Sequence, residues 1–300
     1  MAVLPFKKNN PGCPCCGPAE NPPGGPNCPC ACYAFDDNAE DSSISNLHLT
    51  STGASPTDYT TGKLDKAFKH TGSQYHEHAD NACFNLSGGI NVWFWLKSDY
   101  AAPYNWGPPV PDDEVTIQPE GVVTKGSWEN LGSDQRDFLG EWGIFWDETS
   151  EQPTLNGNIF FVVGNGTGDL YDGNAVARAP TEEKWEFYFF WASIAEGKIY
   201  GIKWGGDDEE VSGVTVEANL TGTQTLTSGE KLFIGNNDGF AKLGEQTYDS
   251  VPRPWLIDNV GFCKDIGTKA EMEERAENLY NSGDGRACNH AGFEGGGCCA

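Results

Sequence analysis

The sequence has no hydrophobic run long enough to cross a membrane as a helix. A spanning helix needs ~20 apolar residues, and the longest apolar-rich stretches, near residues 90–96 and 185–195, are much shorter. The N-terminal residues also lack the apolar stretch of a secretory signal peptide. We therefore expect no membrane insertion, and export by a route such as release at lysis unless a leader precedes this numbering.

Basic residues are scarce. The chain has 19 Lys and Arg against 44 Asp and Glu, which gives a formal net charge of −25. Nucleic-acid binding depends on Lys and Arg side chains that displace counterions from the phosphates, and anionic membrane surfaces attract the same side chains. Nucleic acids and anionic membranes are therefore excluded as expected partners. A polyanionic surface keeps a protein soluble, and it also suits divalent cations.

The motifs of common catalytic sites are missing as well. The sequence has no nucleophile elbow, no phosphate-binding glycine loop and no zinc-protease motif. A retaining glycosidase needs two carboxylates about 5–5.5 Å apart. Asp147, Glu148 and Glu151 come nearest to such a pair, but they run into a turn that ends at Pro153. We predict that the chain is not an enzyme, and a β-glucanase-like glycosidase is the less favoured alternative.

Aromatic residues and turn formers are abundant instead. Ten Trp, 38 Gly and 18 Pro suit a large core of short strands joined by turns. Apolar runs bounded by turn residues predict strands at 90–96, 143–146, 157–166, 185–194, 198–204, 231–236 and 255–262. A single helix is predicted over 268–281, with Thr268 near its cap and Gly283 after its end. Many strands and one late helix predict an all-β protein of two antiparallel sheets.

Several short segments carry a family resemblance in the correct order. They are residues 34–43, 62–75, 85–97, 122–126, 184–186, 232–235 and 257–283. Together they resemble the laminin-G-like domains of the concanavalin A-like lectin/glucanase superfamily. The resemblance implies a jelly-roll β-sandwich over residues 33–285, between a Cys/Pro/Gly-rich arm at 1–32 and a Cys/Gly-rich tail at 286–300. An insertion at 100–119, which includes Trp106, departs from the family pattern and is a candidate ligand loop.

The resemblance also implies a calcium ion at the rim of the sandwich. Calcium takes 6–8 oxygen ligands from carboxylates, amides and carbonyls. The resemblance points to Asp36 or Asp37 near the first strand and to Asp258 on the last strand. Asp and Asn are also good turn formers, so these residues have a purely structural alternative. Ca²⁺ is the one cofactor that we consider.

Aromatic side chains are expected on both faces of one sheet. On strand 90–96, Trp93 and Trp95 point away from the face that carries Ile90, Val92, Phe94 and Leu96. Phe187, Phe189 and Trp191 point the same way on the next strand, opposite to Tyr188 and Phe190. A sheet face in water would alternate with polar residues, so something must cover this one. Three covers remain open: the chain itself, a neighbouring subunit, or sugar rings that stack on these residues and on Trp106.

His76 and His78 occupy alternate positions of a predicted strand, with His70 upstream. Alternate residues of a strand share one face, but two imidazoles are too few for a structural zinc site without a further ligand. We interpret this segment as a solvated strand edge.

The cysteines gather at the two ends of the chain. Adjacent cysteines and C-x-C spacings favour disulfides over a zinc site, and an odd total leaves one thiol free or bonded between chains. The predicted cross-linking residues are Cys13, Cys15, Cys16, Cys28, Cys30, Cys32, Cys288, Cys298 and Cys299, whereas Cys83 and Cys263 belong to the sandwich. The ends are expected to be stapled to each other or to a neighbour.

These observations predict a non-catalytic, lectin-like binding or adhesion module. It would be displayed on an extracellular assembly or a virion surface, for example as a phage decoration or fibre protein, and anchored by its cysteine-rich arm. The expected partners are glycans or neighbouring structural subunits, within a homo-oligomer or a larger assembly. The alternative is a purely structural subunit of a particle or filament that binds no glycan.

Overall fold

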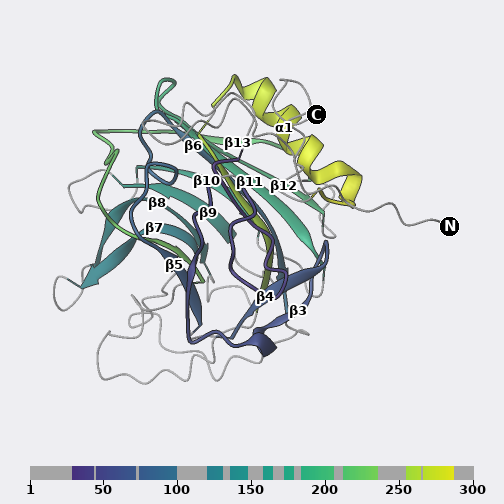
Figure 1. Cartoon of the computed structure of the whole chain (residues 1–300). Helices are drawn as coiled ribbons and strands as arrows, with labels where there is room; N and C mark the ends of the chain where they lie inside the picture. Colours follow the sequence, from purple (N-terminus) through teal and green to yellow (C-terminus); the bar gives the residue numbers. More distant parts are fainter. Residues whose placement is uncertain are drawn as a thin grey trace, which may run out of the picture.

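The structure is a computed structural model of the whole chain. It describes residues 29–43, 45–71, 74–99, 120–130, 136–147, 158–164, 172–178, 184–205, 212–235, 255–264 and 266–286. These residues form two antiparallel sheets and one α-helix, which confirms the predicted all-β sandwich. Figure 1 shows the sheets as two layers, with the helix on the outside of one of them.

The first sheet carries the elements that matter most for function. Within the described residues it has eight strands in the order β13-β12-β11-β6-β15-β4-β3, and β1 also pairs with β15. Their bounds are Ala31–Tyr33 (β1), Tyr59–Thr61 (β3), Lys66–His70 (β4), Ile90–Ser98 (β6), Glu186–Ser193 (β11), Lys198–Gly205 (β12), Val216–Asn219 (β13) and Trp255–Cys263 (β15). β6 and β15 lie at the centre because both are apolar along nearly their whole length and are buried on both faces.

The second sheet packs against the first. Its seven described strands follow the order β10-β9-β8-β7-β14-β5-β2. Their bounds are Thr50–Thr52 (β2), Tyr75–His78 (β5), Glu120–Asn130 (β7), Arg136–Asp147 (β8), Asn158–Val163 (β9), Asp172–Arg178 (β10) and Leu232–Ile234 (β14). A short 3-10 helix, Pro56–Asp58 (η1), leads into β3, and another, Asn281–Gly283 (η2), follows the α-helix.

The predicted alternation of side chains on the strands is confirmed. Val92 and Phe94 lie in the core between the two sheets, together with Tyr188 and Phe190. The residues between them on β6 and β11 point to the outer face of the first sheet, where they form a second apolar cluster. A period of two residues in the sequence therefore separates the two faces correctly.

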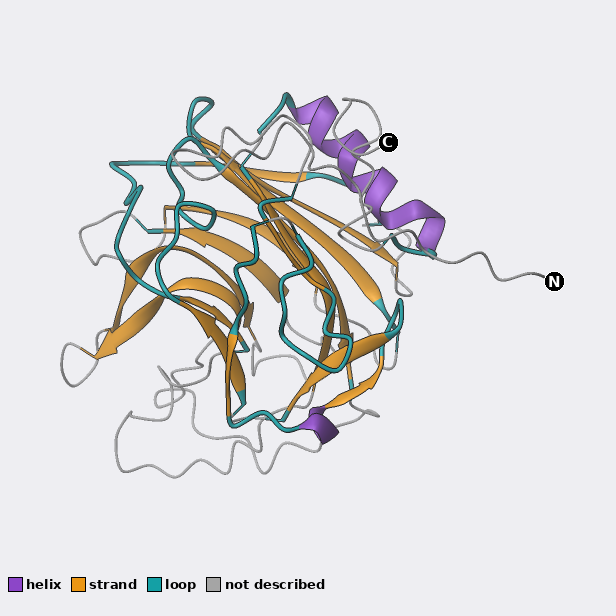
Figure 2. Cartoon of the chain, in the orientation of Figure 1, coloured by secondary structure: helices purple, strands orange, loops and turns teal. Residues whose placement is uncertain are grey.

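The single helix also forms where it is predicted. Helix α1 spans Lys269–Tyr280, and the Thr268 side chain caps its first turn together with Glu271. Asn281 ends it in the left-handed conformation, with φ of 48°. The buried side of α1 packs on the outer face of the first sheet, as Figure 2 shows for the purple helix against the orange strands. None of the described helices is long and apolar enough to span a membrane.

The sandwich begins slightly earlier than the sequence analysis places it. Cys30 and Cys32, assigned to the arm, are buried. The intervening Ala31 begins β1 and lies opposite Phe262 of β15 in the sheet register. The arm therefore enters the sandwich as a buried strand.

Candidate functional site

The outer aromatic face of the first sheet is covered by the chain itself. The predicted ligand or subunit face is at most 2% exposed at Trp93, Trp95, Phe187, Phe189 and Trp191. Met272, Ala276 and Leu279 of α1 pack against these rings. Of the three covers considered, the structure has the intramolecular one at these positions, so the five rings present no surface to a sugar or a subunit. Trp106 lies outside the described residues.

Three further aromatic residues lie between this buried cluster and the surface. Trp185, Trp204 and Tyr280 pack against the cluster but are only partly buried. They lie just before β11, near the end of β12 and at the last position of α1. Because Trp204 lies opposite Phe187 in the register of β11 and β12, strand pairing places it beside the buried rings. We call Trp185, Trp204 and Tyr280 the aromatic rim.

The rings of the rim are held in fixed orientations. Tyr280 stacks on Trp204, with ring centroids 5.5 Å apart and 16° between the planes, and on Trp95 at 5.9 Å and 29°. The backbone of Gly213 comes so close to Trp204 that a Cβ there would lie 3.0 Å from the indole Nε1. Lys63 Nζ lies 4.8 Å from the centre of the Trp95 ring. Rigid aromatic rings lose little conformational entropy when they make a contact.

Asp258, one of the predicted calcium ligands, fixes the loop that carries Lys63. Its Oδ2 accepts hydrogen bonds from the backbone N–H groups of Lys63 at 2.7 Å and Leu64 at 2.9 Å. Its Oδ1 accepts one from Asn259 Nδ2 at 2.6 Å. A Cβ at Gly62 would lie 2.8 Å from Oδ2, so the loop approaches the carboxylate too closely for a larger residue. Asp258 therefore connects the centre of the first sheet to the surroundings of Trp95.

The three predicted calcium ligands form hydrogen bonds or an ion pair within the chain. Asp36 Oδ1 accepts a hydrogen bond from the Lys66 backbone at 3.1 Å, and Asp37 Oδ1 lies 2.5 Å from Lys66 Nζ. Burial, with a smaller contribution from the charge of Asp36, raises the pKa of Asp258 to about 7. In the described ranges, no three His, Cys, Asp or Glu side chains are grouped so as to hold a metal ion.

Two fully buried carboxylates on the strands serve the fold. Glu141 Oε2 accepts a hydrogen bond from the Leu86 backbone at 2.6 Å, and Glu186 Oε2 lies 2.8 Å from Lys203 Nζ. A buried carboxylate is stable only when it is paired or hydrogen-bonded, so these contacts account for both residues without catalysis. Glu148 and Glu151, the glycosidase alternative, lie outside the described residues.

The interpretation of His76 as part of a solvated edge is wrong, because β5 lies between β14 and β2 and His76 is fully buried. Its Nδ1 lies 2.8 Å from Ser51 Oγ, and its ring lies 4.3 Å from that of Phe68. His70 is also buried and stacks on Trp255 at 4.5 Å and 24°. Burial lowers the pKa of both histidines to about 4, so both are neutral at physiological pH.

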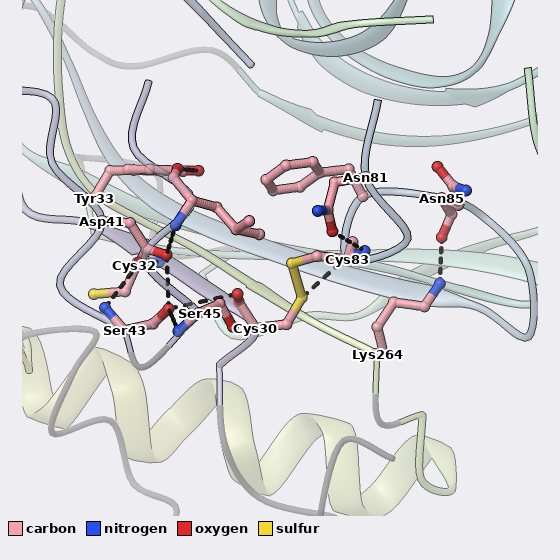
Figure 3. The surroundings of a disulfide bond; sticks show 12 residues. Cys30, Cys32, Tyr33, Asp41, Ser43, Ser45, Asn81, Cys83, Asn85 and Lys264 are labelled. Atoms are coloured by element: carbon pink, nitrogen blue, oxygen red, sulfur yellow. Dashed lines mark hydrogen bonds between the residues drawn. A yellow bond between two sulfur atoms is a disulfide. The ribbon is translucent and has the colours of Figure 1, made fainter. Parts of the chain in front are cut away.

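One predicted cross-linking cysteine pairs with a cysteine of the sandwich. Cys30 and Cys83 form a disulfide with 5.7 Å between their Cα atoms and a sequence separation of 53, shown in Figure 3. Cys32 is also disulfide-bonded. The remaining predicted cross-links lie outside the described residues and concern Cys13, Cys15, Cys16, Cys28, Cys288, Cys298 and Cys299. Disulfides persist mainly in oxidising environments, which agrees with an extracellular protein.

The sequence does not identify the aromatic rim as a candidate site. Trp185 and Trp204 were included in predicted strands, but no ligand role was assigned to either. The signal that could have found them is the same alternation that groups Phe187 with Trp191, since Trp185 continues that face by one step. Tyr280 could not be found this way, because its place depends on how α1 docks on the sheet.

Solved structures with a similar fold were found. The binding domain of Paraclostridial Mosquitocidal Protein 1 matches with a TM-score of 0.53 at 11% identity, over 84% of this chain and 52% of that one. The receptor-binding domain of a botulinum neurotoxin mosaic serotype C/D matches with a TM-score of 0.52 at 12% identity, over 83% of this chain and 50% of that one. The chain therefore spans about half the length of these two structures.

A third match is domain 4 of a GH43 extracellular arabinanase from Geobacillus stearothermophilus, in complex with arabinotriose. Its TM-score is 0.49 at 16% identity, over 83% of this chain and 98% of that one, which is too low to carry an argument. No protein-family model matches the sequence, and no curated protein is significantly similar to it. The likenesses show the fold alone, a β-sandwich of the jelly-roll type.

Proposed function

We propose that the chain is a non-catalytic binding module that recognises carbohydrate through its aromatic rim. The observation that carries the proposal is that Trp185, Trp204 and Tyr280 are partly exposed at the edge of a buried aromatic cluster. Ligand sites combine apolar and aromatic surface with a few polar groups, and the apolar face of a sugar ring packs well on a rigid indole or phenol. The net charge of −25 makes a neutral glycan a better candidate than a polyanion.

We also propose where the module is displayed and how it is attached. The laminin-G-like resemblance supports a lectin-like role within the β-sandwich fold. The buried disulfide supports display in an oxidising environment, such as an extracellular assembly or a virion surface. The cysteine-rich arm would attach the sandwich to that assembly. Non-reducing gel electrophoresis of the native protein tests the attachment, because a ladder that collapses with a thiol reagent indicates bonds between chains.

A glycan array tests the proposed recognition. The wild-type chain should bind a restricted set of glycans, and Trp185→Ala should weaken that binding about tenfold or more, in the range found when a central aromatic contact is truncated. Trp185 is the best choice because, unlike Trp204, it is not sandwiched between Tyr280 and Gly213. The array should be run with calcium and with a chelator. Equal binding in both is expected if Asp36, Asp37 and Asp258 hold no calcium.

Phe233→Ala is a matched control for the array. Phe233 is a half-buried aromatic residue of β14, on the other sheet, where its ring lies 6.0 Å from that of Tyr75. Its removal should leave glycan binding unchanged. If the wild-type chain binds no glycan but forms an ordered multimer, the protein is the purely structural subunit of the alternative hypothesis. Release of reducing sugar from β-glucans would instead show an enzyme.

A further inference from the structure

Taken by themselves, the hydrogen bonds of the first described strand attach it only weakly to the sandwich. β1 pairs with β15 over three residues from Ala31 to Tyr33, and Tyr33 also forms an isolated antiparallel bridge with Asp41. Two further backbone bonds run from Cys30 N to the Phe262 carbonyl oxygen at 2.7 Å and from Ser42 N to the Cys32 carbonyl oxygen at 2.8 Å. A force that pulls the chain outwards at residue 29 would open these few bonds one after another. Without a further connection, the strand would peel from the sheet.

The Cys30–Cys83 disulfide supplies such a connection at the start of β1, in addition to the disulfide of Cys32. Cys30 immediately precedes β1, and its partner Cys83 lies in the loop between β5 and β6. We call residues 79–89 of this loop the hub loop. Force on the arm therefore reaches the hub loop through a covalent bond before it reaches the hydrogen bonds of β1.

The second sheet holds the hub loop from one side. Trp142 Nε1 of β8 donates a hydrogen bond to the Phe84 carbonyl oxygen at 2.7 Å, and both residues are buried. The neighbouring Glu141 accepts the Leu86 N–H at 2.6 Å. Both bonds end on the three residues that follow Cys83, so they act beside the point where the disulfide would transmit force.

A side chain next to the first sheet holds the hub loop from the other side. Lys264 directly follows β15, and its Nζ donates hydrogen bonds to the carbonyl oxygens of Asn85 and of Ser87, the latter at 2.9 Å. Figure 3 shows Lys264 reaching Asn85 on the same stretch of chain that carries Cys83. Lys125 of β7 adds an ion pair with Asp80 at 2.7 Å.

The hub loop also leads directly into the best-anchored strand of the first sheet. β6 begins at Ile90 and pairs with β11 on one side and β15 on the other. To extract a strand with two partners, many hydrogen bonds must break together, whereas an edge strand can be released one bond at a time. The path from Cys30 through Cys83 therefore ends on elements of both sheets.

We propose that the Cys30–Cys83 disulfide and the hub loop form a load-bearing junction, which passes pulling force from the N-terminal arm into both sheets. This inference rests on the proposed attachment through the arm. Without attachment through the arm, no pulling force would act on the disulfide or on the hub loop. The junction would allow an adhesion module to hold its ligand under tension without losing its first strand.

Single-molecule pulling of the full chain, with handles at both ends, tests the junction. All samples carry Cys288→Ser, Cys298→Ser and Cys299→Ser, so that the tail cannot join the two handles by a shortcut. With the disulfide intact, we expect a high-force first rupture. We also expect a final contour length shorter by about 180 Å than in the Cys30→Ser/Cys83→Ser variant, since the bond hides 53 residues at ~3.4 Å each.

The variant without the disulfide should release its N-terminal strand at a clearly lower force. Lys264→Met should also lower the first rupture force but keep the shorter contour length, because it loosens the hub loop and not the disulfide. Lys198→Met, which breaks an exposed ion pair with Glu217 on β13, serves as the control and should leave the rupture force unchanged.

If the double variant does not fold, reduction of the folded parent in the pulling chamber breaks the Cys30–Cys83 bond together with the disulfide of Cys32, and the same fall in the first rupture force is expected. An equal first rupture force with and without the disulfide would overturn the inference. The experiment needs no glycan and no assembly, so its outcome is independent of the array. Failure of the array alone would refute the proposed function and leave the junction standing.

Discussion

Tyr280 and Trp204 stack with 16° between their ring planes and 5.5 Å between their centroids, although one ends helix α1 and the other lies near the end of strand β12. Because of this contact, the position of the aromatic rim depends on how α1 docks on the sheet. The same helix covers the rings of the outer face. The helix therefore both hides most of the aromatic surface and leaves a small part of it exposed at the rim.

Removal of the Tyr280 ring should loosen the helix and the rim together. Tyr280→Ala removes contacts with Trp204, Trp95 and Phe187. We expect the free energy of unfolding to fall by about 1–3 kcal/mol, measured by urea denaturation. Tyr280→Phe keeps the ring and should behave nearly as wild type. An unchanged unfolding midpoint in the alanine variant would show that α1 docks without this stack.

A single methyl group at Gly261 should disturb the centre of the first sheet. A Cβ there would lie 2.2 Å from atoms of the buried Trp93 ring, and a well-packed core has no room to move that ring away. We expect Gly261→Ala to destabilise the protein by at least ~2 kcal/mol. Gly88→Ala meets no atom within 4 Å and should cost only the ~1 kcal/mol of a left-handed backbone. Equal effects of the two changes in thermal unfolding would contradict the packing described for Trp93.

Acid should destabilise the sandwich through His70 and His76. Burial lowers the folded-state pKa of each to about 4, against about 6.5 in the unfolded chain. Between these values the unfolded state binds more protons, so the free energy of unfolding falls as the pH falls. The loss reaches about 3 kcal/mol for each histidine. Asp58 faces His76 and opposes part of the effect.

Denaturant titrations from pH 7 to pH 4 would measure this loss. His76→Gln should remove about half of the histidine contribution, provided that the variant folds at pH 7. A wild-type protein whose stability is constant over this range would show that neither ring is buried as described.

Asp258 should have the opposite effect to the histidines, because it should raise the free energy of unfolding as the pH falls. Burial raises its folded-state pKa to about 7, above about 3.9 in the unfolded chain. The folded state therefore binds more protons between these values. Its contribution to stability is present at low pH and is lost as the pH rises through 7. Asp258→Asn removes this term, so the variant should lose stability more steeply than wild type between pH 7 and pH 5. Parallel pH profiles of the two proteins would refute a protonated Asp258.

Features that depend on local sequence patterns could be predicted, whereas features that depend on long-range contacts could not. The strand at 90–96 and the helix at 268–281 could be predicted, because alternation and capping residues are local signals. The assignment of Trp93 and Trp95 to one face was also correct. What covers that face depends on the docking of α1, which no local pattern records. The pairing of Cys30 with Cys83 depends in the same way on the folded chain.

His76 and Asp258 illustrate a second limit. In sequence, a short polar segment such as Tyr75–His78 is typical of an edge strand. In the structure β14 and β2 flank it, and the burial of its histidines, which occupy alternate positions, could not be predicted from the sequence. Asp258 was predicted as a ligand from a family resemblance. Its Oδ2 accepts hydrogen bonds from the backbone N–H groups of Lys63 and Leu64, a contact between segments far apart in sequence that the resemblance does not record.

Hydroxyl-radical footprinting with mass spectrometry tests the central claim most directly, with and without the glycan that binds best on the array. In the free protein we expect oxidation of Trp185, Trp204 and Tyr280, and protection of Trp93 and Trp191. Bound glycan should protect the three rim residues and leave Phe233 unchanged. Oxidation of Trp93 and Trp191 in the free protein, or a glycan footprint away from the rim, would contradict the account.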